Sequence, residues 1–134
     1  EDFINMVNDF LFHVVWAAKK IQRGELWTAK MCIDSYLKNY LLRVIEMYAI
    51  CVNKADVWHN GRFLEEWADE AILRELKLCF AHYDKQDMIT VLISTHKLFS
   101  KLAGKVAGYC GYSYPDEADI YTGEYLGRNL YSAT

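Results

Sequence analysis

The first residues of the chain separate into an apolar and a polar side when they are placed on a helix with about 100° between neighbours. In residues 3–23 the apolar side is filled without exception by Phe3, Met6, Val7, Phe10, Leu11, Val14, Ala17, Ala18 and Ile21. The opposite stripe carries Asn5, Asn8, Asp9, His13, Lys19, Lys20 and Arg23. This pattern predicts an amphipathic helix that packs its apolar side against a core.

Two aromatic residues, Phe12 and Trp16, lie in the middle of the polar stripe of this helix. Because the apolar side already faces the core, these two rings need a different partner. One candidate is another segment of the chain, such as the C-terminal tail or a neighbouring helix. The others are a bound ligand and a second protein surface.

Turn residues divide the rest of the chain into further helices. Gly24 is placed to adopt the left-handed conformation that follows a helix end, and the short break predicts a second helix antiparallel to the first. Asp84, three residues before Asp87, predicts a capped start for the longest of the later helices. The expected helices cover residues 25–52, a short stretch around 63–67 after a loop over 53–61, 69–81 with Asp69 as cap, 85–109, and a segment after Pro115 that carries Tyr121, Tyr125 and Leu126. We predict an all-α fold, an up-and-down bundle of about five helices.

Two polar rows follow the second predicted helix. The first is made by Ser35, Asn39, Arg43 and Glu46. The second is a ladder of charges with four-residue spacing, Lys30, Asp34 and Lys38, which is most simply a solvated patch.

Composition narrows the possible functions. A chain of 134 residues with 53% apolar residues is expected to form one domain with a substantial core. A net charge of −3 without a basic run gives no footprint for nucleic acid, and no apolar run approaches the roughly 20 residues that span a bilayer. We expect a cytoplasmic protein that binds neither nucleic acid nor a membrane.

The four cysteines are expected to be small buried hydrophobic residues: Cys32, Cys51, Cys79 and Cys110.

The chain carries no common catalytic signature. It lacks a glycine-rich phosphate loop, and it lacks the Gly-Ser turn followed by two alternating aspartates with which a nucleotidyltransferase holds metal ions. Glu117 and Asp119 have alternate spacing, but an acidic first turn after Pro115 is the simpler interpretation. His96 falls on an apolar helix side, which favours a hydrogen-bonded core histidine over a metal ligand. Three lysines could form a solvated face or meet a phosphate: Lys97, Lys101 and Lys105.

The polar stripe of the first helix has the chemistry of a small-molecule site. A carboxylate such as that of Asp9 pairs with an ammonium or guanidinium group, and amides such as those of Asn5 and Asn8 bind hydroxyls. An aromatic ring such as that of Phe12 or Trp16 can cover the face of a sugar. The candidate substrate-binding residues are Asn5, Asn8, Asp9, Phe12, His13, Trp16, Asn39, Arg43 and Glu46. The last three extend the site only if their row faces the same cleft, and a buried Arg43–Glu46 pair that supports packing is an equal alternative.

Five short motifs in this order resemble the C-terminal half of the aminoglycoside 6-adenylyltransferases, the streptomycin adenylyltransferase family. They are Asn8-Asp9-Phe10, Arg23-Gly24-Glu25-Leu26 with Lys19 before it, Leu41-Leu42-Arg43, Gly61-Arg62-Phe63 and Tyr114-Pro115-Asp116. The resemblance covers nearly the whole chain. It departs from the family at Leu11, where relatives carry an aromatic residue, and at His13 and Trp16, which have no clear counterpart.

The resemblance implies that residues 1–134 form a single helical substrate-binding domain, and the first residue, Glu1, suggests a piece of a longer polypeptide. In such enzymes an N-terminal nucleotidyltransferase domain binds ATP and magnesium, and AMP passes to a hydroxyl of the aminoglycoside streptomycin. That domain is absent from this chain, so we expect the chain to bind no cofactor itself and to be inactive in adenylyl transfer alone.

Two other functions stay open at this point. A stand-alone module could use Phe12 and Trp16 to dock a separately encoded minimal nucleotidyltransferase or another protein partner. Small helical toxin nucleases have similar bundles, but they place a histidine four to six residues after an arginine. Arg74 and His82 are too far apart for that motif.

Overall fold

A computed structural model describes residues 2–130 of the chain, and these residues contain no strand. The α-helices are α1 (Asp2–Gln22), α2 (Leu26–Met31), α3 (Leu37–Cys51), α4 (Leu64–Trp67), α5 (Glu70–Leu76), α6 (Lys85–Cys110) and α7 (Asp116–Asn129). A π-helical segment, η1 (Cys32–Tyr36), joins α2 to α3, and 3₁₀ turns cover His59–Gly61 and Lys77–Cys79. The predicted all-α bundle is confirmed.

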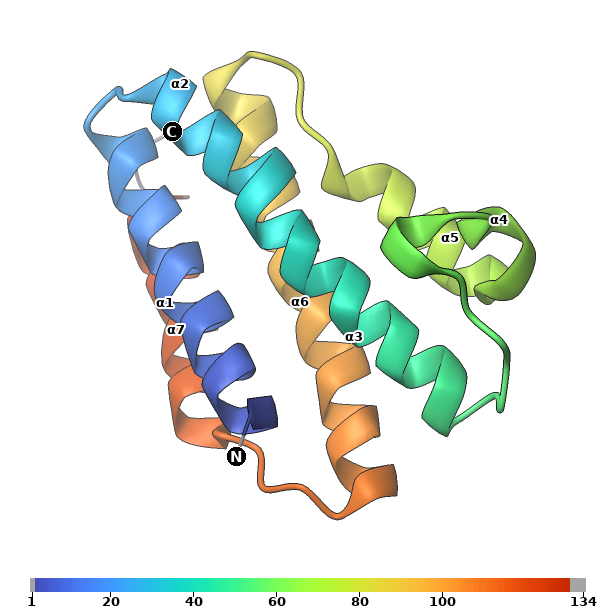
Figure 1. The fold of residues 1–134 in the computed structure, drawn as a ribbon. Helices are drawn as coiled ribbons and strands as arrows, with labels where there is room; N and C mark the ends of the chain where they lie inside the picture. The colour runs from blue at the N-terminus through green and yellow to red at the C-terminus, as the bar shows by residue number, and fades with distance from the viewer. Residues whose placement is uncertain (1, 131–134) are drawn as a thin grey trace.

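The long helices α1, α3, α6 and α7 lie side by side in the bundle (Figure 1). The α2–η1–α3 rod returns antiparallel to α1, and α7 lies against α1. The short helices α4 and α5 stand to one side and carry the chain back to the end from which α6 starts. As a result α3 and α6 pack together and run in the same direction, so that their C-terminal ends meet.

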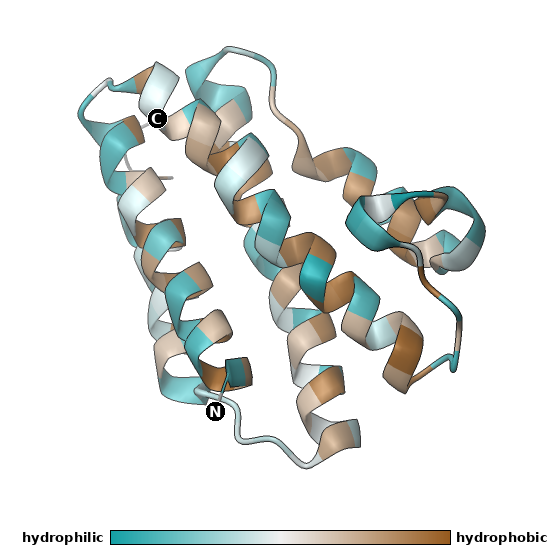
Figure 2. Ribbon diagram, in the orientation of Figure 1, coloured by the Kyte–Doolittle hydropathy of each residue, from teal (hydrophilic) through white to brown (hydrophobic). Residues whose placement is uncertain are grey.

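Helix α1 has the orientation that its sequence predicts. All nine residues of its predicted apolar side are buried, and Phe10 stacks on Phe99 of α6 with ring centroids 3.7 Å apart. Figure 2 shows brown and teal alternating along α1 as its two sides come into view. At its end Gly24 has φ +79°, and the Glu25 N–H donates to the Lys20 carbonyl at 2.9 Å, which closes a Schellman turn.

The second predicted helix contains a π-helical segment that the sequence pattern does not indicate. The Leu37 N–H donates to the carbonyl of Cys32, five residues back, so it cannot serve the Ile33 carbonyl as in a regular α-helix. Lys38 Nζ donates to that Ile33 carbonyl at 2.8 Å and to Thr95 Oγ1 of α6 at 3.1 Å. A buried ammonium thus supplies the hydrogen bond that the wider turn removes.

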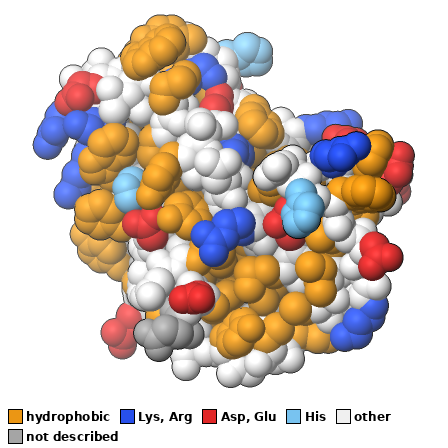
Figure 3. Space-filling view, in the orientation of Figure 1, with side chains coloured by type: hydrophobic (Ala, Val, Ile, Leu, Met, Phe, Trp, Pro, Cys, Tyr) orange, Lys and Arg blue, Asp and Glu red, His pale blue; other side chains and the backbone are white. Residues whose placement is uncertain are grey.

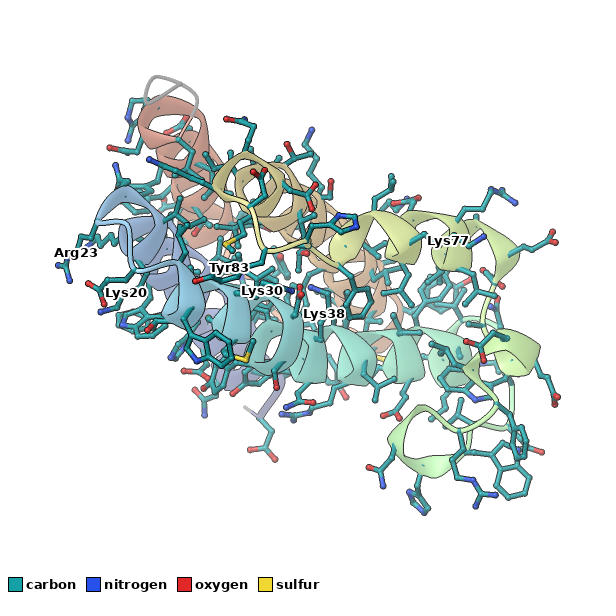
Figure 4. The ribbon with its side chains drawn as sticks, turned by 90° about the horizontal axis from the view of Figure 1, so that it is seen from above. Lys20, Arg23, Lys30, Lys38, Lys77 and Tyr83 are labelled. Carbon is teal, nitrogen blue, oxygen red and sulfur yellow. The ribbon has the colours of Figure 1, made fainter. Side chains whose placement is uncertain are left out.

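The prediction of a solvated patch at Lys30, Asp34 and Lys38 is wrong. The helical segment formed by α5 and its 3₁₀ turn ends at Cys79, two residues before the predicted end at Ala81. The residues that follow Cys79 cross over the row of charges. Lys30 Nζ donates to the Ala81 carbonyl at 2.6 Å, and Asp34 Oδ1 accepts the Ala81 N–H at 3.2 Å. Lys38 lies under the ring of Phe80, with Nζ 5.1 Å from its centroid, and is only 9% exposed. Figure 4 shows Lys30, Lys38 and Tyr83 on this covered side of the bundle.

The burial of Lys38 predicts a stability that increases with pH. Burial lowers the pKa of the Lys38 ammonium to about 8, whereas an unfolded lysine titrates near pH 10.4. Between these values the unfolded chain holds a proton that the folded chain has lost, so raising the pH favours the folded state, by about 3 kcal/mol in total. Urea unfolding of the wild type and of Lys38→Met at pH 7.5 and 9.5 should show a stability difference that shifts in favour of the wild type at the higher pH. Comparing the two proteins cancels the opposite effect of buried thiols such as Cys32 and Cys79, whose pKa values burial raises. Parallel pH profiles for the two proteins would contradict a buried, charged Lys38.

Candidate functional site

A groove of about 510 Å³ runs between α1 and the α2–η1 rod. Its lining residues are His13, Trp16, Trp27, Thr28, Met31, Cys32, Ser35, Tyr36 and Asn39. Three predicted site residues therefore line one groove: His13 and Trp16 from α1, and Asn39 from α3. The volume lies in the range of small-molecule sites.

Asp9 adjoins this groove and is held by two tyrosines that sequence reasoning missed. Tyr36 donates its hydroxyl to Asp9 Oδ2 at 2.7 Å, and Tyr40 donates to the same oxygen. His13 Nδ1 lies 3.4 Å from Asp9 Oδ1 on the next turn of α1. The carboxylate stays partly accessible to solvent, because the Asp9 side chain is 39% exposed.

The surroundings of Asp9 keep it ionised. Partial burial raises its pKa, but the hydroxyl hydrogen bonds from Tyr40 and Tyr36 and the nearby His13 outweigh that effect, so the pKa of Asp9 is lowered. The reciprocal effect raises the pKa of Tyr36, chiefly through its hydrogen bond to Asp9. At neutral pH the site therefore presents a fixed negative charge flanked by neutral phenols.

Aromatic rings continue from Asp9 along the groove. The His13 ring lies 4.3 Å from the Tyr36 ring and 5.9 Å from the Trp16 ring, measured between centroids. Trp16 is half-buried, with Lys20 Nζ 5.0 Å from its centroid. Trp27, on the facing helix, is 67% exposed. A ligand in the groove would contact aromatic side chains from both helices and lie next to a carboxylate.

The two aromatic residues of the polar stripe thus have different surroundings. Trp16 is partly covered by the chain and lines the groove, whereas Phe12 lies outside the groove lining and is 63% exposed. The nearest ring to Phe12 is that of His13, at 5.2 Å between centroids. No described segment of the chain buries Phe12. The last residues of the C-terminal tail, 131–134, lie outside the described residues. Figure 3 shows hydrophobic side chains gathered over the α1 side of the molecule, with a histidine and an acidic side chain among them.

The remaining predicted residues lie around the groove. Asn5 and Asn8 are exposed on α1 and do not line it. Arg43 is exposed and lies over the Tyr40 ring, with its guanidinium carbon 5.6 Å from the centroid, so the alternative of a buried Arg43–Glu46 pair is wrong. Glu46 is half-buried, and burial raises its pKa despite the nearby His59 and Arg43.

A second polar cluster, His96, Ser100, Tyr114 and Asp119, joins α6 to α7. His96 is buried, as predicted for a core histidine, and its Nε2 lies 2.6 Å from Asp119 Oδ1. Ser100 donates to the same oxygen at 2.9 Å, and the Tyr114 hydroxyl donates to Asp119 Oδ2 at 2.5 Å. Asp119 lies in the first turn of α7, as expected, but its carboxylate points into the bundle and serves packing.

The lysine stripe of α6 is a solvated face. Lys97, Lys101 and Lys105 are exposed, and Lys101 is paired with Glu75. Within residues 2–130 no group of three or more histidine, cysteine, aspartate or glutamate side chains is arranged to hold a metal ion. No helix in the same range combines the length and apolar character that a membrane-spanning segment needs.

Comparison with known families gives one result that covers nearly the whole chain. Residues 1–129 match the sequence profile of a family described as streptomycin adenylyltransferase. No curated protein shows significant similarity to the chain. The profile spans every helix described above, including the groove, Asp9 and the α6–α7 polar cluster.

Proposed function

Because the chain belongs to the streptomycin adenylyltransferase family, we propose that it is the substrate-binding domain of an enzyme that transfers AMP from ATP to an aminoglycoside hydroxyl, which inactivates the antibiotic. The observation that carries this proposal is the ionised Asp9, clamped by Tyr36 and Tyr40 beside an aromatic groove. ATP and Mg²⁺ belong to a nucleotidyltransferase domain that would act together with this chain.

The residues of the groove match the chemistry of an aminoglycoside. Such antibiotics carry cationic ammonium or guanidinium groups on rings rich in hydroxyls, and Asp9 offers a carboxylate whose orientation the two tyrosines fix. The Trp16 and Trp27 rings can cover sugar faces, and Asn39 can bind a hydroxyl. Asn5 and Asn8 are close to Asp9 in sequence and extend the polar surface of α1 beyond the groove.

In this proposal the chain positions the acceptor and does no bond chemistry. Holding a hydroxyl at a fixed place next to the nucleotide raises its effective concentration at the phosphorus. Asp9 acts by pairing with a cationic group of the antibiotic, and the tyrosines keep that carboxylate from rotating. The isolated chain is therefore expected to bind an aminoglycoside without transferring AMP to it.

Titration of streptomycin into the purified chain, followed by calorimetry and tryptophan fluorescence, tests the role of Asp9. We expect Asp9→Ala to weaken binding about 10- to 100-fold, because one charge-assisted contact is worth roughly 1.5 to 3 kcal/mol. Asp9→Asn, which keeps the shape and removes the charge, should weaken it similarly. Glu117→Ala, which removes an exposed acid outside the groove, is the matched control. Equal affinities for wild type, Asp9→Ala and the control would exclude Asp9 as a substrate contact.

The exposed Phe12 favours a second candidate function, the docking of a separate nucleotidyltransferase. A large apolar ring that is 63% exposed next to an aromatic groove has the character of an interface anchor. Phe12→Ser separates the two functions. Unchanged streptomycin affinity together with lost association to a nucleotidyltransferase would support docking. Weakened streptomycin binding would instead indicate that Phe12 forms part of the wall of the substrate site.

A further inference from the structure

Two of the four cysteines lie against each other at the end of the bundle away from the Gly24 turn. Cys51 is the last residue of α3 and Cys110 is the last residue of α6, and these helices run in the same direction (Figure 1). The Cys110 thiol donates to Cys51 Sγ, with the sulfurs 3.4 Å apart. Both residues are only half-buried, so the expectation that all four cysteines are buried is wrong for this pair.

We propose that Cys51 and Cys110 form a redox modification site that closes to an intramolecular disulfide when the protein meets a hydroperoxide. A disulfide bond is about 2.0 Å long, so the sulfurs must approach by about 1.4 Å from their present separation. Both cysteines end a helix, and Gly111 after Cys110 already has a left-handed φ of +73°. Helix ends fray more easily than helix interiors, which gives the two side chains room for that movement.

The reaction balances with one hydroperoxide. One cysteine, as its thiolate, attacks the peroxide oxygen; an S–O bond forms, the O–O bond breaks, and an alcohol or water leaves as the sulfur becomes a sulfenic acid. The second cysteine, also as its thiolate, then attacks that sulfur, so that the S–S bond forms and the sulfenic oxygen leaves as water. Two thiols are oxidised and one hydroperoxide is reduced. A dithiol such as dithiothreitol reverses the modification.

The other two cysteines are expected to react more slowly with a hydroperoxide. Cys32 is 5% exposed, and burial raises the pKa of its thiol to about 12. Cys79 is fully buried, and burial raises the pKa of its thiol as well. The hydrogen bond from Cys110 and partial burial raise the pKa of the Cys51 thiol too, so access decides which thiols react first. Cys51 and Cys110 are partly exposed, whereas Cys32 and Cys79 are buried.

Mild treatment of the reduced protein with hydrogen peroxide tests the proposal. We expect the intact mass to fall by two hydrogen atoms, two free thiols to remain, and a proteolytic map to show Cys51 linked to Cys110. The melting temperature should rise by about 5 to 10 °C and return after dithiothreitol, because the cross-link restricts the unfolded chain over a long loop. A linkage that involves Cys32 or Cys79, or a mass gain with no cross-link, would overturn the proposal.

Single variants give an independent control. Cys51→Ser and Cys110→Ser should each abolish the mass loss and the thermal shift, whereas Cys32→Ala should keep both. The map of the wild-type protein decides the matter even if a variant folds poorly. A mass loss that persists in Cys110→Ser would exclude this pair as the site.

Discussion

Replacing Phe10 by alanine is expected to lower the free energy of unfolding by about 3 to 5 kcal/mol, whereas Phe12→Ala should change it by less than about 0.5 kcal/mol. The two phenylalanines stand two residues apart on α1 but on opposite sides. Phe10 is fully buried and stacks on Phe99, so its loss leaves a cavity between α1 and α6. Phe12 is 63% exposed and has few contacts to lose.

Urea unfolding followed by circular dichroism measures both changes under the same conditions. If Phe10→Ala does not fold, Phe10→Leu gives a smaller cavity and a measurable loss. A large loss in Phe12→Ala would show that Phe12 is covered in solution, and it would remove the basis for regarding this ring as free for a ligand or a partner.

The pair also shows why α1 could be predicted in full from the sequence. Its apolar positions recur with the helical period over 21 residues, and a pattern of that length leaves only one orientation against a core. Gly24 and Asp84 marked a helix end and a helix start for equally local reasons, a left-handed φ and a side chain that accepts the Asp87 N–H. Features that depend on a few neighbouring residues could therefore be predicted from the sequence.

Features that depend on contacts between distant segments could not be predicted from the sequence. The charges of Lys30, Asp34 and Lys38 suggested solvent, because nothing in the local pattern shows that residues after Cys79 will cover them. Once covered, each of these polar groups needs a partner, and backbone groups of that crossing segment or of η1 provide it.

The same limit applies to the candidate site. The polar stripe of α1 pointed to Asp9, His13 and Trp16, but the facing helix was identified only through the row that contains Asn39. Tyr36 and Tyr40 were missed because their four-residue spacing is common in packed helices. Their role becomes visible only in the structure, where both hydroxyls donate to Asp9 on the other helix. A carboxylate with two tyrosine donors could not be read from either helix alone.

The second large expected effect concerns Asp119, and we expect Asp119→Ala to lower the free energy of unfolding by about 3 to 5 kcal/mol at neutral pH. Its carboxylate accepts hydrogen bonds from Ser100 and Tyr114 and pairs with His96, and its side chain is only 15% exposed. Alanine would leave these donors without an acceptor in a largely buried space. Glu117→Ala, which removes an exposed acid two residues earlier on α7, should change the stability by less than about 0.5 kcal/mol.

The pH dependence separates this network from simple packing. Burial raises the pKa of Asp119, but the hydrogen bonds from His96, Tyr114 and Ser100 outweigh it, so the folded pKa lies below the ordinary value. The stabilisation is therefore present above about pH 4, where an unfolded aspartate is ionised, and is lost as the pH falls through the lower folded pKa. The stability gap between wild type and Asp119→Ala should narrow in that acidic range. If the difference in the free energy of unfolding stayed constant on acidification, the loss in Asp119→Ala would come only from the smaller side-chain volume. The charge of Asp119 would then not hold α7 against α6.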